Sequence, residues 1–443
     1  MSIKVVKFGG SSLADAGQIK KAAAIIKSEP ERRYVVPSAP GKRFKDDIKV
    51  TDMLYSCYEK ASLGEDFSAD FENIKKRYND IIAGLELDLS LDAQFEQIRQ
   101  NLAHAGREYA ASRGEYLNGI VIASYLGYTF IDAADVIVFS DEGVMQRKET
   151  VHKLRERLAD VENAVIPGFY GKSFSGVVRT FSRGGSDVTG SLVARAVHAA
   201  VYENWTDVSG ILVADPRVVE DPVVIPVITY KELRELSYMG FSVLHEDAIF
   251  PVRTAGIPIN IRNTNAPADP GTMIVPDSEI NEETAPRTIT GIAGKKGFCA
   301  VNMEKGMMNS EVGFIRDVLN VFAELDINVE HIPSGIDTLS IIADAKSLEG
   351  KEQLLLSELR KAVEPDSLEI EPEIALLAIV GRGMRKTRGT AARIFASLAH
   401  GRINVKMIDQ GSSELNVIIG VNENDLHQAI RGIYDAFISS TLD

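Results

Sequence analysis

The sequence predicts an α/β protein, in which a domain with a mainly parallel sheet between helices precedes two small ferredoxin-like domains. Apolar strand-like runs alternate with helix-periodic runs from residue 3 to about 275, a rhythm typical of parallel sheets. A stretch rich in Pro, Gly and acids at 265–287 indicates a boundary near 285–295. Beyond it the chain repeats itself at an offset of 76 positions, which carries Gly313 onto Gly389.

The first domain, expected at 1–285, opens with a strand at 3–8, a Gly-Gly-Ser-Ser turn and a helix near 15–28. A polar, helix-periodic stretch at 68–112 predicts a helical lobe. Further apolar runs continue the alternation, with the helical stretch SLVARAVHAA (191–200) among them. These runs are YVVPSA (34–39), GIVIAS (119–124), DVIVF (135–139), NAVIPGF (163–169) and NWTDVSGILVA (204–214).

The two repeats are expected at 298–372 and 373–443. Each has the order β-α-β-β-α over about 70 residues, which is typical of a ferredoxin-like domain. After the last predicted helix, 424–438, too few residues remain for a closing strand. We therefore expect the strand-like run TITGIA (288–293), which the first repeat leaves unused, to complete the sheet of the second repeat.

Composition limits the possible partners and locations. The 443 residues are 45% hydrophobic and carry a formal net charge of −14, so duplex nucleic acid and anionic membranes are excluded as general partners. Two cysteines, Cys57 and Cys299, cannot form a disulfide framework. No apolar stretch approaches the roughly 18 residues of a spanning helix, and the start lacks the cationic region of a signal peptide. We expect a soluble, cytoplasmic protein.

The turn after the first strand is a candidate phosphate site. Paired glycines, Gly9 and Gly10, let backbone N–H groups approach an anion, and Lys7 adds a point charge. Taken alone, the motif is equally compatible with a plain strand-to-helix turn. The sequence does not have the spacing of a P-loop, which disfavours a P-loop kinase.

The loop SRGGSDVTG (182–190) is a second candidate. Arg183 has the planar fork that binds carboxylates, and Gly184 and Gly185 can expose N–H groups to the same anion. Asp187 can orient a cation or hold Lys7 in place. An N-cap formed by Ser186 or Asp187 explains the same residues equally well.

A third segment, 205–217, places Thr206 and Asp207 at a strand end and Arg217 in the following loop, which suits a nucleotide. On its own this segment is better explained as a β-turn. Glu115, taken alone, is a surface carboxylate. Histidines such as His198 and His245 show no metal-ligand spacing, so the sequence supports neither zinc nor covalent catalysis.

Taken together, several motifs resemble the aspartate kinases of the amino acid kinase family. The motifs are KFGGSS (7–12), SAP (38–40), RGE (113–115), PGFYG (167–171), SRGGSD (182–187), WTDVSGILVADPR (205–217), VLHEDAIFPVRTAGIPINIRNT (243–264) and PGT (270–272). The repeats resemble the paired ACT regulatory domains of that family. The resemblance implies the amino acid kinase fold and a monofunctional enzyme, without the homoserine dehydrogenase half of bifunctional relatives.

The resemblance also implies which residues form the site. Lys7 and Asp187 are the implied catalytic residues. Those implied for ATP are Lys7, Gly9, Gly10, Thr206, Asp207, Leu212, Arg217, Ser242 and Val243. Those implied for L-aspartate are Ser38, Thr51, Glu115, Phe169, Arg183, Gly184, Gly185 and Ser186, with Arg183 on its α-carboxylate and Glu115 on its ammonium.

This sequence departs from the family pattern on the nucleotide side. Leu212 stands where many relatives have Tyr or Phe, Ser242 where they have Lys, and Glu246 where they have Pro. The loss of an aromatic ring and of a cation is expected to weaken the nucleotide contacts.

The implied reaction transfers the γ-phosphate of ATP, with Mg²⁺, to the β-carboxylate of L-aspartate. The product, 4-phospho-L-aspartate, leads toward lysine, threonine and methionine, and the resemblance implies feedback inhibition through the ACT domains. The implied assembly is a homodimer or a dimer of dimers through those domains.

The first repeat is the better candidate for the effector. It offers helix-opening N–H groups as donors and Glu330 as an acceptor, whereas Lys406 takes the place of Glu330 in the second repeat. We therefore favour lysine, alone or with threonine. The candidate effector residues are Gly313, Phe314, Ile315, Asn328, Val329, Glu330 and Ser334.

Two alternatives remain. One is another amino acid kinase, such as a glutamate or acetylglutamate kinase. The other is a catalytically silent amino-acid sensor, in which Leu212 and Ser242 mark a decayed ATP site.

Overall fold

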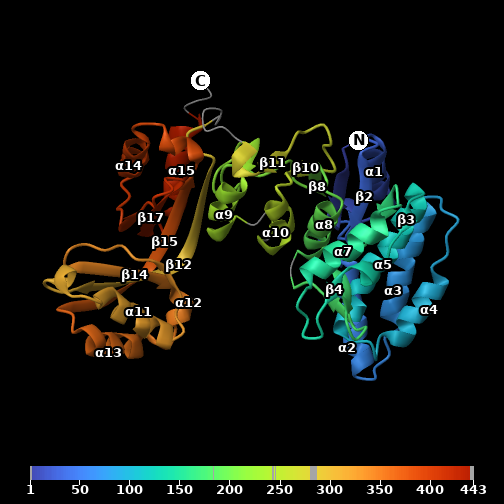
Figure 1. Cartoon of the computed structure of the whole chain (residues 1–443), viewed down its shortest axis with the longest axis horizontal. Coiled ribbons are helices and arrows are strands. Elements are labelled where there is room, and N and C mark those ends of the chain that lie inside the picture. The colour runs from blue at the N-terminus through green and yellow to red at the C-terminus, as the bar shows by residue number, and fades with distance from the viewer. Residues whose placement is uncertain (1, 183, 242–243, 245, 280–286, 440–443) are drawn as a thin grey trace. The chain divides into compact units, whose positions relative to one another are not determined.

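The computed structural model describes residues 2–182, 184–241, 244, 246–279 and 287–439. These residues form two compact units (Figure 1). The first unit takes the described residues of Met1–Ile211, Val224–Tyr230 and Ser242–Ile280, and the second unit takes those of Leu212–Val223, Lys231–Phe241 and Asn281–Asp443. No helix in the described part of the chain is long and apolar enough to cross a membrane.

The main sheet of the first unit is mainly parallel, as the sequence predicts. The pairs β1–β2, β1–β8, β8–β10 and β2–β5 are parallel, and β10–β11 is antiparallel. In spatial order its strands within the described residues are β3 (Thr129–Phe130), β5 (Ala164–Val165), β2 (Arg32–Pro37), β1 (Lys4–Phe8), β8 (Val201–Thr206), β10 (Ile259–Asn263), β11 (Thr272–Val275) and β9 (Val227–Thr229). A smaller sheet contains β4 (Val138–Phe139), β6 (Tyr170–Ser173) and β7 (Val178–Thr180).

Side chains alternate between the two faces of the sheet along β1, so neighbouring residues contact different helices. Val6 and Phe8 belong to the core shared with α1 (Ala16–Lys27) and α5 (Arg107–Leu126). Lys7 therefore points to the opposite face, where α8 (Gly185–Ala196) packs on β1. The other helices of this unit are α2 (Val50–Ser62), α3 (Ser68–Gly84), α4 (Asp92–Asn101), α6 (Ala133–Val136), α7 (Arg147–Leu158) and α10 (Glu246–Ala255), with the short turns η1 (Ser11–Leu13) and η2 (Asp277–Glu279).

One predicted strand is wrong. GIVIAS (119–124) lies in the C-terminal half of α5, which ends at Gly127 in the left-handed conformation, φ 73°. This helix is buried along most of its length, including Val121, Ile122 and Ala123. A helix covered on all sides shows no amphipathic period, so a short apolar run in it looks like a buried strand.

The second unit contains one antiparallel sheet that both repeats share. Within the described residues its order is β13 (Val329–His331), β14 (Thr338–Asp344), β12 (Gly291–Glu304), β15 (Ser367–Val380), β17 (Asn416–Asn422) and β16 (Met407–Asp409). The C-terminal half of β12 pairs with β14 in the first repeat, and the C-terminal half of β15 pairs with β17 in the second. The N-terminal half of each long strand pairs with the other long strand. The start of β15 therefore completes the sheet of the first repeat, and the start of β12, which precedes that repeat, completes the sheet of the second.

The strand-like run 288–293 illustrates this exchange, because Gly291, Ile292 and Ala293 pair antiparallel with Val380, Ile379 and Ala378. Helices cover the sheet of each repeat. They are α11 (Phe314–Glu324), α12 (Ala345–Leu348) and α13 (Glu352–Val363) in the first repeat, and α14 (Thr390–His400) and α15 (Leu426–Phe437) in the second, with short turns η4 (Met308–Ser310) and η5 (Arg382–Arg385).

Two earlier segments of the chain join the second unit, 212–223 and 231–241, the latter holding most of α9 (Tyr230–Tyr238). The Tyr434 hydroxyl accepts a hydrogen bond from the backbone N–H of Val223 at 3.0 Å. The buried Glu232 of α9 accepts one from the Thr290 hydroxyl at 2.7 Å.

Candidate active site

A buried lysine at the end of β1 is held by two partners from different elements. The Lys7 ammonium lies 2.7 Å from Oδ1 of Asp187, in the first turn of α8. Asn204, on the neighbouring strand β8, donates a hydrogen bond from Nδ2 to the same Asp187 oxygen at 2.8 Å. Its Oδ1 lies 3.4 Å from the Lys7 ammonium. Lys7 and Asn204 are 8% and 4% exposed, so this cation is fixed in a position where water screens it weakly.

The glycine turn that follows lies against a second loop. Gly9 donates its N–H to the Trp205 carbonyl at 3.0 Å, and Gly10 accepts a hydrogen bond from the Gly41 N–H at 2.8 Å. A Cβ on Gly41 would lie 2.5 Å from the Gly10 carbonyl carbon, so no side chain fits there. A Cβ on Gly10 would lie 3.0 Å from the Ala39 carbonyl oxygen. The two loops therefore approach each other through backbone alone.

Glu115 is a buried carboxylate rather than the surface group that its sequence context suggests in isolation. It lies on α5 and is 6% exposed. Desolvation by burial raises the pKa of its carboxyl to about 8, against a hydrogen bond with the Ala39 backbone that lowers it. Its Oε2 has no hydrogen-bond partner within the described residues. A buried carboxylate oxygen without a partner is suited to an ammonium group.

The segment after β2 brings Ser38 close to this carboxylate. Ser38 donates its N–H to the Phe8 carbonyl at 3.1 Å, and its own carbonyl accepts from the Asn118 amide at 2.7 Å. Asn118 and Glu115 both lie on α5. Thr51, in the first turn of α2, is partly exposed.

The PGFYG loop packs on the start of α8. Phe169 has a left-handed backbone, φ 80°, and its N–H donates to the Thr189 hydroxyl at 3.2 Å. A Cβ on Gly185 would lie 2.6 Å from the Phe169 ring, and one on Gly168 would lie 2.6 Å from Ser186. Gly184 precedes the helix with φ 58°. Phe169, Gly184, Gly185 and Ser186 are thus brought together, while Arg183 lies outside the described residues.

The residues expected on the nucleotide side are divided between the units. Thr206 ends β8, and its hydroxyl donates to the exposed Asp207 at 3.2 Å. Leu212 and Arg217 belong to the second unit. Arg217 is paired there with Asp215, Nη2 to Oδ2 2.6 Å, and its side chain is 88% exposed. Ser242 and Val243 lie outside the described residues.

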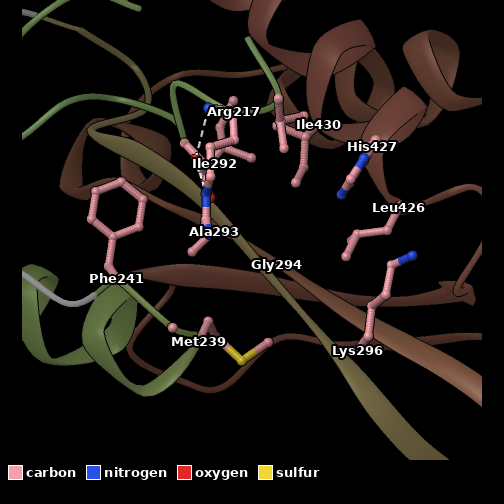
Figure 2. Close-up of a pocket in the computed structure, with 13 residues that line it drawn as sticks. Arg217, Met239, Phe241, Ile292, Ala293, Gly294, Lys296, Leu426, His427 and Ile430 are labelled. Carbon is pink, nitrogen blue, oxygen red and sulfur yellow. Dashed lines mark hydrogen bonds and ion pairs between the residues drawn. The ribbon is translucent and has the colours of Figure 1, made fainter. Parts of the chain in front are cut away.

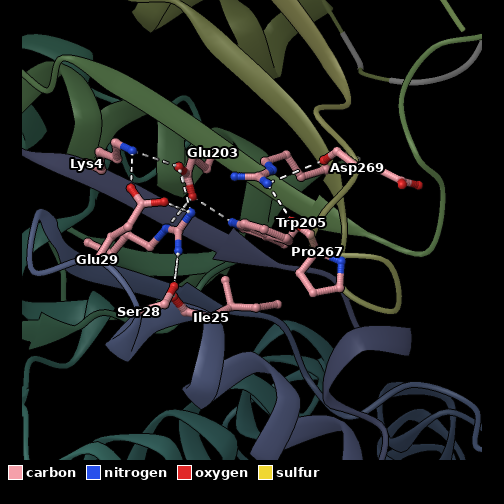
Figure 3. Close-up of polar contacts among 10 residues, drawn as sticks. Lys4, Ile25, Ser28, Glu29, Glu203, Trp205, Pro267 and Asp269 are labelled. Carbon is pink, nitrogen blue, oxygen red and sulfur yellow. Dashed lines mark hydrogen bonds and ion pairs between the residues drawn. The ribbon is translucent and has the colours of Figure 1, made fainter.

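A buried network of charged and aromatic side chains packs around Glu203 and Trp205 of β8 (Figure 3). Glu203 pairs with Arg32, Oε2 to Nε 2.8 Å, and accepts from the Trp205 indole N–H at 2.8 Å. The Trp205 ring contacts the Arg32 and Arg262 guanidinium groups, whose carbons lie 5.2 and 4.5 Å from its centroid. Because the Trp205 carbonyl holds Gly9, this network fixes the backbone on which the glycine turn rests.

Sequence reasoning missed Asn204, Glu203 and Arg32. Glu203 and Asn204 stand directly before the candidate segment 205–217, but nothing in their spacing indicates a role. The signal is the strand register, which places Lys7 opposite Asn204. That register is a property of the sheet.

The candidate effector residues lie in the first repeat. Gly313 has φ 94° and precedes α11, whose first residues are the buried Phe314 and the 42% exposed Ile315. Desolvation raises the pKa of Glu330, and its Oε2 is buried with no hydrogen-bond partner among the described residues.

The remaining effector candidates lie on β13 or close to it in the sequence. Asn328 precedes β13, which contains Val329, and Ser334 forms an isolated bridge with Leu339 of β14. In the second repeat, Lys406 is already paired with Glu371. Glu330 thus has a buried oxygen without a partner among the described residues, whereas Lys406, at the matching position of the second repeat, is paired with Glu371.

The first unit therefore combines a buried cation beside a glycine turn with a desolvated carboxylate on α5, which bonds to the backbone of Ala39. The former can bind a polyphosphate, and the latter can bind an ammonium group. Together they can hold an anionic donor and a zwitterionic acceptor side by side.

Comparison with known proteins agrees with this chemistry. The amino acid kinase family model matches residues 2–263, and an ACT domain model matches residues 377–437. The chain is 37% identical to aspartokinase 3 of Bacillus subtilis, over 99% of this chain and 100% of that protein.

Solved structures are similar as well. The crystal structure of Clostridium acetobutylicum aspartate kinase matches with 50% identity and a TM-score of 0.87, over 99% of this chain and 100% of that chain. E. coli aspartokinase III matches in complex with aspartate and ADP (25% identity, TM-score 0.72) and in complex with lysine and aspartate (25%, 0.70). Each match covers 98% of this chain and 99% of the E. coli chain.

Proposed function

The chain belongs to the aspartokinases of the amino acid kinase family and is an aspartate kinase; we propose that it converts L-aspartate and MgATP into 4-phospho-L-aspartate and ADP at the ends of β1, β2 and β8. The observation that carries this placement is the buried Lys7–Asp187 pair beside the glycine turn.

Lys7, Gly9 and Gly10 bind the ATP phosphates in this proposal. The Lys7 ammonium neutralises charge on the γ-phosphate as it is transferred, and Asp187 and Asn204 keep that ammonium in place. Mg²⁺ enters with the nucleotide, held by its phosphates. Such a site lowers the barrier by charge neutralisation and positioning, with no covalent intermediate.

The acceptor needs no general base. The aspartate side chain, with an unperturbed pKa of about 3.9, is already an anion at neutral pH. Glu115 binds its ammonium and Arg183 its α-carboxylate, which leaves the β-carboxylate to face the phosphate. Ser38, Thr51, Phe169, Gly184, Gly185 and Ser186 line the remainder of this subsite.

Thr206, Asp207, Leu212, Arg217, Ser242 and Val243 are proposed for the nucleoside and the outer phosphates. The resemblance supports this group, and so does the place of Thr206 at the end of β8, next to β1 in the sheet. With Leu212 in place of an aromatic side chain, we expect weaker contact with the adenine than in relatives that have Tyr or Phe.

The second unit is proposed to be regulatory. An ACT model matches its second repeat, and E. coli aspartokinase III has been crystallised with lysine. We place the effector in the first repeat, around Gly313–Ile315, Asn328–Glu330 and Ser334. The unpartnered, buried Oε2 of Glu330 would accept a hydrogen bond from the ligand's ammonium. Lysine is the favoured effector, alone or with threonine.

The wider role follows from the reaction. We propose that the product leads toward lysine, threonine and methionine, and that the end product inhibits the enzyme by shifting a two-state equilibrium. The proposed domains are 1–285, 298–372 and 373–443, with the strand at 288–293 completing the last. The proposed assembly is a homodimer, or a dimer of dimers, through the second units.

A coupled assay of ADP release tests the proposal. ADP release is expected with L-aspartate but not with L-glutamate or N-acetyl-L-glutamate, and lysine is expected to reduce it, with threonine assayed alone and in combination. Preference for either glutamate compound would assign the chain to another amino acid kinase. No turnover, with lysine still bound in a calorimetric titration, would make the chain a sensor.

A further inference from the structure

A cavity of about 310 Å³ in the second unit lies apart from the proposed effector residues (Figure 2). Its walls come from β12, the first turns of α15 and the two earlier segments that join this unit, 212–223 and 231–241. Neither the resemblance nor the sequence motifs assign a ligand to it, although Arg217 at its rim is also a proposed ATP residue.

The inner wall of this cavity is apolar. Ile292 of β12 and Ile430 of α15 are 0% and 3% exposed, and Met239 is 2% exposed. Gly294 also lines it, and a Cβ there would lie 2.7 Å from the Leu426 side chain. The missing side chain at Gly294 therefore lets β12 and α15 approach closely, with only hydrocarbon between them. A small apolar body fits such a wall.

One side of the cavity carries a lysine and a histidine. Figure 2 shows the Lys296 ammonium and the His427 imidazole on the same side of the cavity, with Leu426 between them, and Met239 and Phe241 on the other side. Lys296 makes no ion pair within the described residues. Leu426 and His427 open α15, whose N-cap residue, Asp425, makes no side-chain capping hydrogen bond. The N–H groups of this first turn carry positive potential.

The acid that lines the cavity is already neutralised. Asp215 accepts from the Arg217 guanidinium at 2.6 Å and from the Arg217 backbone N–H at 2.8 Å. The Arg217 hydrogen bond is the main cause that lowers the pKa of Asp215. Since Asp215 and Arg217 cancel, Lys296 is the remaining Lys, Arg, Asp or Glu side chain of the cavity lining. The acids at the start of α15 do not line the cavity: Glu423 accepts a hydrogen bond from the Gly297 N–H at 2.7 Å, and Asp425 is the N-cap residue.

We propose that this cavity binds a small amphiphilic monocarboxylate. The carboxylate lies at Lys296 and His427, on the N-terminal turn of α15, and the hydrocarbon body lies on Ile292, Ile430 and Met239. The site is a second ligand site of the regulatory unit, distinct in position and in polarity from the residues around Glu330, where an acid faces the ligand.

Titration calorimetry on the full-length protein tests this site with three matched probes. They are 4-methylpentanoate, L-leucine, which adds an ammonium group, and 4-methylpentan-1-ol, which lacks the charge. We expect saturable binding of 4-methylpentanoate and none of the alcohol. L-leucine shows whether the natural ligand is an amino acid or a carboxylic acid without an ammonium group. If L-leucine binds as tightly as 4-methylpentanoate or more tightly, the ligand is an amino acid. If L-leucine binds more weakly, the ligand is a deaminated acid.

The Lys296→Met variant keeps the apolar stem and removes the charge, so it should weaken 4-methylpentanoate binding at least tenfold. Lys295→Met is the matched control, because Lys295 is the adjacent exposed lysine but lies outside the cavity and near Asp344 at 3.9 Å. The Lys295→Met variant should bind 4-methylpentanoate with the same affinity as the unmodified protein. No binding of either carboxylate, or equal affinity in the Lys296→Met variant, overturns the proposal.

The test is independent of the proposed function, since binding is measured without turnover. Glu330→Ala should leave 4-methylpentanoate binding unchanged, and saturating lysine should not displace the probe. If Glu330→Ala or lysine abolishes binding, the probe occupies the effector site, and the cavity is not the site we propose. A failure of the aspartate kinase assay would leave the calorimetric result intact.

Discussion

The Lys7 ammonium and the Asp187 carboxylate lie 2.7 Å apart, although one belongs to the first strand and the other opens a helix far along the chain. Asn204 contacts both from the adjacent strand. The pair thus joins three elements at the end of the sheet where the glycine turn begins, and the catalytic proposal rests on this arrangement.

Lys7→Ala should lower kcat by about 10²–10³, because the substitution removes the cation that meets developing charge in the transition state. KM values for ATP and aspartate should change much less. Steady-state kinetics measure the change, with Lys20→Ala, an exposed lysine of α1, as the control. A folded Lys7→Ala protein that keeps most of its kcat would rule out this role.

Asn204→Leu should lower kcat by roughly tenfold with little effect on KM for aspartate, because Asp187 loses a buried hydrogen-bond donor and positions Lys7 less well. Tyr202→Phe is the control, since the Tyr202 hydroxyl donates to the backbone carbonyl of Asp187, at 3.3 Å, and not to its carboxylate within the described residues. Asn204→Gln should recover part of the rate. If kcat instead follows the melting temperature across all three variants, Asn204 acts on stability alone.

Glu115→Gln should abolish a pH dependence of aspartate binding. The pKa of Glu115 is raised to about 8, so the carboxyl is mostly protonated at pH 7 and must ionise to hold an ammonium. KM for aspartate should therefore fall roughly tenfold between pH 7 and pH 9 in the unmodified enzyme. In Glu115→Gln it should be higher and flat, while Glu72→Gln, on the surface of α3, keeps the slope. A slope that persists in Glu115→Gln assigns the titration to another group.

The Glu115 carboxyl should also make the folded protein less stable as pH rises, although the same rise in pH improves aspartate binding. Its pKa rises from an ordinary 4.5 to about 8 on folding, so the folded state binds more protons between these values and stability falls as pH rises through them. Urea unfolding at pH 5.5, 7 and 8.5 should show Glu115→Gln gaining stability relative to the unmodified protein at each step. A difference that stays constant with pH would falsify the assignment of a buried, titrating Glu115.

Glu330→Ala should weaken inhibition by lysine at least tenfold, equivalent to about 1.4 kcal/mol of coupling, with kcat unchanged. The reason is that Glu330 offers a buried, unpartnered oxygen to an ammonium. The measurement is the lysine concentration for half-inhibition. Glu324→Ala, an exposed acid of α11, is the control. Unchanged inhibition would place the effector elsewhere.

Local features of the sequence were enough to predict the architecture. Strand–helix alternation up to about 275 predicts the mainly parallel sheet, because each element must bury one apolar face against the next. The 76-residue offset predicts two similar units, since the same hydrophobic pattern folds in the same way. The prediction of a strand at GIVIAS was wrong, because a helix that is buried on most sides shows no amphipathic period in its sequence.

Tertiary structure decided what depends on contacts between distant residues. Only the register of β1 against β8 brings Asn204 to Lys7, and only the fold buries Glu115 and thereby raises its pKa. Packing likewise decides that 212–223 and 231–241 join the second unit, and that β12 and β15 each serve both repeats. The reason is physical: propensity and hydrophobic period are local along the chain, whereas register, desolvation and strand exchange exist only once separate elements have met.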